Sequence, residues 1–151
     1  MKYLSIIFSV TLLISCSKEP QPLIYNEDNC SYCKMIVSDQ RYGAEVITAK
    51  GKNYKFDSIE CMAAFVLSEA STIEIHSLWT IDFNNPGKFV DAEKAFYLHS
   101  ELLKSPMGLN FSSFSSWETA QNVKNVYPGS VMQWAEVKDN VKDQWLDDKS
   151  N

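Results

Sequence analysis

Three sulfur-bearing side chains lie close together near the start of the chain, at Cys30, Cys33 and Met35. A Cys-x-x-Cys pair can bind one metal ion through two thiolates, and the methionine adds a thioether two residues later. Thiolate and thioether are soft donors, which select Cu(I) over hard cations such as Mg²⁺ or Ca²⁺. Zinc also binds thiolates but seldom a thioether, so the methionine favours a copper site over a structural zinc knuckle.

The number of cysteines also bears on this site. The chain has four of them, at positions 16, 30, 33 and 61. If Cys16 is modified, as argued below, three thiols remain, whereas an exported protein stabilised by disulfides normally has an even number. Either one disulfide forms and one thiol stays free, or a metal ion protects the set as bound thiolates. A redox dithiol of Cys30 and Cys33 is a further alternative, although the preceding segment 25–29 does not resemble the strand that a thioredoxin-like motif follows.

A hairpin is predicted after this motif. Residues 42–50 are rich in β-branched and apolar side chains, which favour a strand. A turn at Gly51 leads into a second strand over 54–56. A third strand is predicted over 78–83, where apolar and polar side chains alternate up to an Asn-Asn-Pro-Gly turn.

A helix is predicted between the second and third strands. Asp57 or Ser58 can cap its N-terminus, and Asp57 has capping-box spacing to Glu60. Cys61 lies on a face next to the apolar stripe of this helix. The stripe is formed by residues at helical intervals, namely Ile59, Met62, Ala63 and Val66.

The second half of the chain repeats this order. Strands are predicted over 95–100 and 109–114, and a helix begins at Ser115, with Glu118 in the capping-box position. A closing strand is predicted over 131–137. Each half is therefore expected to run strand, strand, helix, strand.

Two packed ββαβ units of this kind predict an α+β fold. The first unit, over 29–90, begins with the Cys-x-x-Cys segment as a treble-clef-like metal-binding start. The second unit spans 91–138. Beyond it, the acidic side chains predict a solvated tail over 139–151.

The N-terminus has the features of an export signal and a lipid anchor. An apolar run over 4–14 suits the core of a signal peptide and is too short to span a bilayer. The small residue directly before Cys16 makes this end of the run resemble a bacterial lipobox. We therefore expect a signal peptide over 1–15, acylation of Cys16 that anchors the protein to the lipid bilayer, and a polar tether over 16–28.

Charge and motif content narrow the function classes. The formal net charge is −5 and the chain has no basic stripe, so nucleic acid is not an expected partner. No acid–base pair, nucleophile triad or glycine-rich phosphate loop is visible in the sequence, and we expect no catalysis. The expected location is the bacterial cell envelope, on the inner or the outer membrane and facing the periplasm.

The sulfur residues and their surroundings resemble known metal-binding patterns. The blocks Cys30-x-x-Cys33-x-Met35 and Tyr54-x-Phe56-x-Ser58-x-x-Cys61-x-x-x-Phe65 are similar to the treble-clef motif of the YHS and TRASH domains. The order of the whole chain resembles the NosL family of copper-binding lipoproteins, which help to mature nitrous-oxide reductase. Further blocks carry this second resemblance, namely the lipobox, Phe89-Val90-Asp91-Ala92, Ser105-Pro106-Met107-Gly108 and Tyr127-Pro128-Gly129-Ser130-Val131 with Trp134, Glu136 and Val137 after it.

This resemblance implies a membrane-anchored carrier of Cu(I). Many family members carry only the second cysteine and the methionine, which correspond to Cys33 and Met35. Cys30 and Cys61 are further candidate ligands of this chain, and Met107 matches the methionine of the family's second-half motif. We expect an open, partly exposed site, because a carrier must also release its ion.

The resemblance also implies partners. The carrier would deliver copper to an assembly machinery in the envelope, including an ABC-transporter complex and nitrous-oxide reductase. Two other interpretations stay open: a membrane-anchored thiol-disulfide oxidoreductase that uses Cys30 and Cys33, and a structural zinc-binding module.

Overall fold

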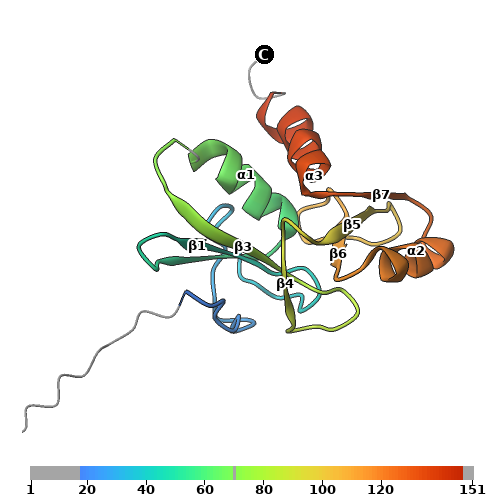
Figure 1. Ribbon diagram of the computed structural model, residues 1–151, viewed down its shortest axis with the longest axis horizontal. Coiled ribbons are helices and arrows are strands. Elements are labelled where there is room, and N and C mark those ends of the chain that lie inside the picture. The colour runs from blue at the N-terminus through green and yellow to red at the C-terminus, as the bar shows by residue number, and fades with distance from the viewer. Residues whose placement is uncertain (1–17, 70, 148–151) are drawn as a thin grey trace, which may run out of the picture.

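The computed structural model describes residues 18–69 and 71–147, which form two antiparallel sheets with helices packed on them (Figure 1). The first sheet has the strand order β2-β1-β3-β4 and the second has β6-β5-β7. The signal peptide predicted over 1–15 and the lipidation site predicted at Cys16 lie outside the described residues. In the described part of the chain, no helix has the length and apolar character needed to cross a membrane.

The first sheet contains the predicted hairpin and the strand that follows the first helix. All its neighbouring strands pair in the antiparallel sense. The third strand lies at 75–81 rather than at 78–83, and a short fourth strand crosses residue 90, where we placed the end of the first unit. The strands are β1 (Ala44–Thr48), β2 (Asn53–Phe56), β3 (Ile75–Ile81) and β4 (Phe89–Asp91).

The second sheet repeats the arrangement with shorter strands, namely β5 (Phe96–His99), β6 (Phe111–Phe114) and β7 (Ser130–Met132). Helix α2 (Trp117–Val126) connects β6 to β7 and begins after Ser116, whose hydroxyl accepts a hydrogen bond of 3.2 Å from the Thr119 amide. The N-cap is therefore Ser116, one residue after the Ser115 position that we predicted, and the helix itself begins at Trp117. Strand, strand, helix, strand occurs in both halves, and the predicted α+β fold class is confirmed.

The two sheets meet where β3 ends beside β6. The Thr80 and Ser113 hydroxyl oxygens are 3.0 Å apart, and the Phe83 amide donates a hydrogen bond of 2.8 Å to the Ser113 carbonyl. Asp82 and Ser113 form a parallel bridge at the same point. These contacts pack the two units against each other.

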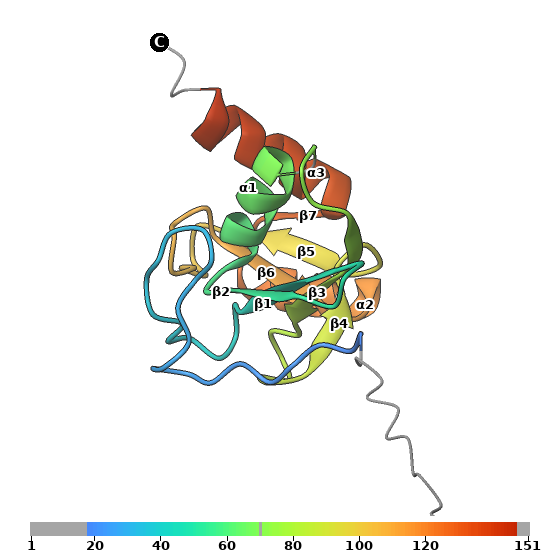
Figure 2. The same cartoon turned by 90° about the vertical axis from the view of Figure 1, so that its left-hand side faces the viewer.

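Helix α1 (Ile59–Glu69) lies at the centre of the main core. Every residue of its first two turns, Ile59 to Phe65, is buried, which is typical of a helix covered on all sides. The helix packs on β1, β2, β6 and α3, and Figures 1 and 2 show α1 and α3 side by side over the sheets. Cys61 is therefore held in the core of the protein.

The closing strand predicted over 131–137 is wrong beyond Met132. Strand β7 ends there, and helix α3 (Trp134–Val141) follows. The Gln133 amide donates a hydrogen bond of 2.8 Å to the Glu136 carboxylate, which caps the start of this helix. We had read the apolar side chains of this segment as alternating, as in a strand. Its buried side chains instead recur at helical intervals, namely Trp134, Val137 and Val141.

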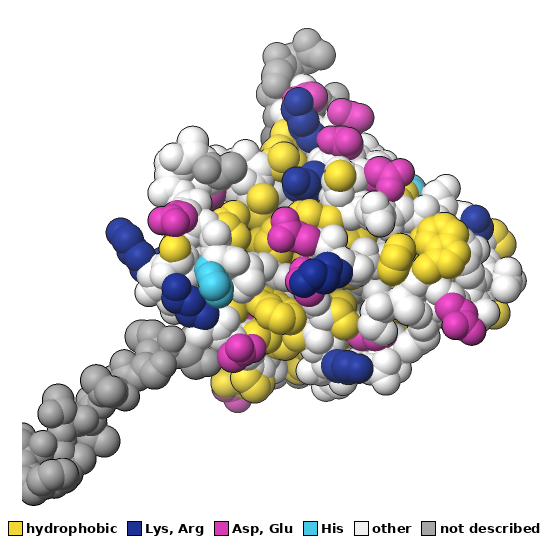
Figure 3. All heavy atoms as spheres, in the orientation of Figure 1, with side chains coloured by type: hydrophobic (Ala, Val, Ile, Leu, Met, Phe, Trp, Pro, Cys, Tyr) yellow, Lys and Arg dark blue, Asp and Glu magenta, His cyan; other side chains and the backbone are white. Residues whose placement is uncertain are grey.

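The acidic segment that we placed outside the fold begins inside α3. A π-helical turn, η1 (Lys142–Leu146), continues the helix, and the Trp145 side chain packs on the main core. Figure 3 shows acidic side chains around this end of α3, mixed with basic ones. The described part of the segment thus exposes its charges while its apolar side chains complete the core.

Two glycines differ in how they would tolerate a side chain. A Cβ atom on Gly129 would lie 2.1 Å from the carbonyl oxygen of His99, whereas one on Gly43 would lie 2.2 Å from a methyl group of Leu23. Replacing Gly129 with alanine is expected to lower the free energy of unfolding by about 1–3 kcal/mol, since the backbone of β5 must shift to remove the overlap. Gly43→Ala should cost less, because the Leu23 side chain can rotate. Urea denaturation of both variants tests this, and an equal loss would contradict it.

Candidate metal centre

The segment from Cys30 to Met35 forms a closed loop of its own. The Cys30 amide donates a hydrogen bond of 2.7 Å to the Met35 carbonyl, and the Lys34 amide donates one of 3.1 Å to the Cys30 carbonyl. The Ser31 amide donates a hydrogen bond of 2.7 Å to the Lys55 carbonyl in β2, which docks the loop on the edge of the first sheet. The loop therefore holds Cys30 and Cys33 near the junction of β2 and α1.

Lys34 closes the loop with a positive φ of 69°, a conformation that suits glycine. Replacing Lys34 with glycine is expected to raise the free energy of unfolding of the reduced, metal-free protein by up to about 1 kcal/mol. The left-handed conformation costs a side-chain-bearing residue roughly 1–2 kcal/mol, and the greater freedom of unfolded glycine offsets part of this gain. Lys88→Gly is the control, because Lys88 is an exposed loop lysine without a positive φ. Urea denaturation tests the difference, and a loss of stability in Lys34→Gly would contradict it.

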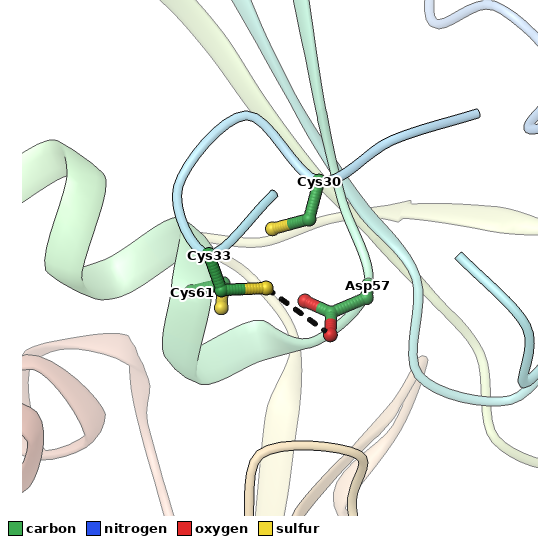
Figure 4. A group of neighbouring side chains, drawn as sticks. All are labelled: Cys30, Cys33, Asp57 and Cys61. Carbon is green, nitrogen blue, oxygen red and sulfur yellow. Dashed lines mark hydrogen bonds between the residues drawn. The ribbon is translucent and has the colours of Figure 1, made fainter. Parts of the chain in front are cut away.

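The other side of the site comes from the junction of β2 and α1. The Ser58 hydroxyl accepts a hydrogen bond of 3.2 Å from the Cys61 amide, so Ser58 rather than Asp57 caps the helix. This leaves the Asp57 carboxylate free to face the loop, and Figure 4 shows it directed toward the cysteines. Cys61 lies in the first turn of α1, and the main core fixes its position.

These segments bring three thiols and one carboxylate together. The sulfur atoms of Cys30, Cys33 and Cys61 and a carboxylate oxygen of Asp57 all lie within 4.8 Å of one another (Figure 4). Cys30, Cys61 and Asp57 are buried, whereas Cys33 is partly exposed. Donor atoms at such distances can bind a single ion after small side-chain rotations. We call these four residues the thiol cluster.

The three thiols of the thiol cluster differ in acidity. A hydrogen bond from Cys61 lowers the pKa of Cys30 to about 6, despite the opposing effect of burial. Burial raises the pKa of Cys33 to about 11, with smaller contributions from Cys30 and Asp57. The pKa of Cys61 is also raised, first by its hydrogen bond to Cys30 and then by burial. A metal cation bound by all three sulfur atoms would therefore displace protons from the thiols.

Asp57 contributes to this centre in a way that the sequence analysis did not predict. There we considered Asp57, with Ser58 as the alternative, only as the cap of the helix. In the structure the Cys33 thiol donates a hydrogen bond to one carboxylate oxygen of Asp57, with sulfur and oxygen 3.6 Å apart. The other oxygen is buried and accepts no hydrogen bond from the described residues. The signal that could have pointed to this role is the position of an acidic residue four places before Cys61, at the start of the same helix.

The two methionines predicted as ligands differ in their exposure. Met35 is 53% exposed, whereas Met107 is half-buried. Met107 and Cys33 share the lining of an open hollow of about 340 Å³ with two aromatic residues, Tyr32 and Trp145. The structure thus brings Cys30, Cys33 and Cys61 together and places Met107 beside Cys33. The assignment of these sulfur residues as metal ligands stays a prediction.

Comparisons with known proteins report on family and fold. The model of the NosL family matches residues 21–142 of the chain. The structure is similar to the crystal structure of the copper chaperone NosL from Shewanella denitrificans, with a TM-score of 0.68 and 20% sequence identity. The similarity covers 80% of this chain and 96% of that chain. Among curated proteins, none matches the sequence.

Proposed function

This chain belongs to the NosL family, and from that premise we propose that it binds Cu(I) at the thiol cluster and passes the ion to another protein. The observation that carries the proposal is the convergence of Cys30, Cys33 and Cys61 within 4.8 Å. The similar structure from Shewanella denitrificans is described as a copper chaperone, which supports the same role.

The donor set suits Cu(I) in particular. Sulfur donors are soft and prefer Cu(I), and a two- or three-coordinate cuprous ion needs no fourth ligand. Cys33 is partly exposed, so a thiolate or thioether of a partner can approach the ion from that side. A site that is closed toward the core and open at one ligand can hold copper and still release it.

Membership of the family also supports a proposal for the cellular role and the location of the protein. We propose that the protein is anchored to the lipid bilayer of the bacterial envelope through acylated Cys16 and faces the periplasm. It would supply copper for the assembly of nitrous-oxide reductase, with an ABC-transporter complex as part of the machinery. In this role it acts as a carrier and not as an enzyme.

Asp57 supports a second candidate function. Three thiolates and one carboxylate match the four donors of a tetrahedral zinc site, and a carboxylate is a harder ligand than Cu(I) prefers. If zinc is the bound ion, the protein is a structural zinc module of an envelope complex. The two candidates differ in what Asp57→Asn does, because a zinc site would lose one of its four ligands and a three-sulfur copper site would lose none.

Anaerobic titration of the reduced protein tests the proposal. With a chromophoric cuprous chelator as competitor, we expect one Cu(I) per chain, transfer of the ion to an excess of a stronger acceptor, and similar affinity in Asp57→Asn. Zinc that copper does not displace, and that Asp57→Asn does lose, would instead establish the zinc module. Reversible turnover of a Cys30–Cys33 disulfide with a dithiol substrate would establish the oxidoreductase.

A further inference from the structure

Cys33 belongs to two groups of donor atoms at once. On its buried side lie the sulfur atoms of Cys30 and Cys61, which are 1% and 0% exposed. On its open side lies the hollow, which Cys33 lines together with Met107, whose side chain carries a thioether, and with Tyr32 and Trp145. No other residue of the described chain is shared by the thiol cluster and the hollow.

The two groups differ in how firmly they can hold copper. The buried donors are thiols that bind as anions, whereas the thioether of Met107 is neutral and a weaker ligand for a cation. The buried donors are also fixed, Cys61 by α1 and Cys30 by the hydrogen bond between its amide and the Met35 carbonyl. Met107 belongs to a turn, in which the Gly108 amide donates to the Ser105 carbonyl at 3.2 Å. Strength and burial therefore both decrease from the cluster toward the hollow.

We propose that Cu(I) occupies two positions that share Cys33: an inner one bound by Cys30, Cys33 and Cys61, and an outer one bound by Cys33 and Met107. The inner position stores the ion, and the outer one presents it in the hollow to an incoming donor. This proposal rests on the proposed function and adds the route of release to it.

The step between the two positions is a ligand exchange. The copper–sulfur bonds to Cys30 and Cys61 break, the bond to the Met107 thioether forms, and the bond to Cys33 is kept. Copper remains Cu(I), and no electron is transferred. The sulfur atoms of Cys30 and Cys61 leave the ion as thiolates, which water can protonate, so the step needs no further reactant.

Met107→Leu separates storage from release, because leucine has nearly the volume of methionine but no sulfur. In the anaerobic full chain loaded with one Cu(I), we expect the equilibrium affinity to change by less than about threefold, while the rate of transfer to a bidentate cuprous chelator falls by about tenfold or more. Met132→Leu is the matched control, because Met132 is also half-buried but lies on β7, outside the hollow and the cluster. This control should transfer copper at the wild-type rate.

The complementary variant removes the inner position. In Cys30→Ser/Cys61→Ser, we expect the affinity to fall by about 100-fold or more, since soft ligands are lost, and the transfer rate to rise. Copper X-ray absorption should show three sulfur ligands in the wild type and two in this variant. Circular dichroism checks that the variant folds, and if it does not, Met107→Leu alone decides.

Either of two results would overturn the proposal. An unchanged transfer rate in Met107→Leu would mean that the outer position plays no part in release. A fall in affinity in Met107→Leu as large as that in the cysteine variant would mean that Met107 belongs to one resting site. Both results differ from failure of the proposed function. In that case the wild-type protein itself would not bind Cu(I) in the titration.

Discussion

Replacing Cys33 with serine is expected to lower the affinity for Cu(I) by more than the roughly 10–100-fold that follows loss of an outer-shell partner of a metal site. Serine keeps the size of the side chain but replaces a soft sulfur with a hydroxyl that stays protonated at neutral pH. Because Cys33 belongs to the thiol cluster and also lines the hollow, no alternative position retains the full donor set. Competition with a cuprous chelator under anaerobic conditions measures the loss.

The neighbouring variant Lys34→Gly controls for disturbance of the loop. It alters the residue directly after Cys33 and leaves every sulfur in place, so its copper affinity should equal that of the wild type. An affinity in Cys33→Ser that matches that of Lys34→Gly would remove Cys33 from the binding site and, with it, the basis of the proposed function.

Replacing Ser105 with alanine is expected to lower the free energy of unfolding by about 2–4 kcal/mol, because each buried polar group left unpaired costs about 1–3 kcal/mol. The Ser105 hydroxyl donates a hydrogen bond to the buried carboxyl group of Glu60 on α1. It also accepts hydrogen bonds from the Asn110 amide at 2.9 Å and the Gly108 amide at 3.2 Å. The alanine would leave all three groups without this partner.

The burial of Glu60 makes this contact important. Its side chain is 0% exposed, burial raises the pKa of its carboxyl group, and its second oxygen accepts no hydrogen bond from the described residues. Glu60→Gln keeps an oxygen that can accept from Ser105 and should therefore lose less stability than Ser105→Ala. Ser68→Ala, at an exposed position on α1, should stay within about ±0.5 kcal/mol of the wild type. Urea denaturation of the reduced protein measures all three variants, and a neutral Ser105→Ala would contradict the prediction.

The elements that the sequence predicted correctly are those set by local patterns. The hairpin of β1 and β2 follows from β-branched residues before a glycine turn and aromatic residues after it. Helix α1 follows from a capping residue before a regular apolar stripe. The segment after Met132 was assigned wrongly because its apolar residues fit alternation over a short span. The Gln133–Glu136 spacing was the local signal for a helix start, and Val141 lay beyond the span that we read as a strand.

The site could be predicted only where its residues are close in the sequence. The spacing of Cys30 and Cys33 pointed to a metal, and the pattern around Cys61 connected the third thiol to them. The role of Asp57 depends on which neighbouring residue caps α1, which the sequence left open between Asp57 and Ser58. The hollow could not be predicted, because its lining comes from segments as far apart as Tyr32, Met107 and Trp145, and only the packing of η1 on the core brings them together.

The loop over 30–35 is closed by two hydrogen bonds between its own backbone groups, and the Ser31 amide joins it to β2 through the Lys55 carbonyl. The opposite wall of the thiol cluster, by contrast, is the most deeply packed helix of the molecule. Cys61 lies on this helix and its replacement would disturb the core, whereas Cys33 in the loop is partly exposed and its replacement disturbs the packing less. We therefore expect the metal preference of the thiol cluster to be altered at the least cost in stability on its loop side, at Cys33.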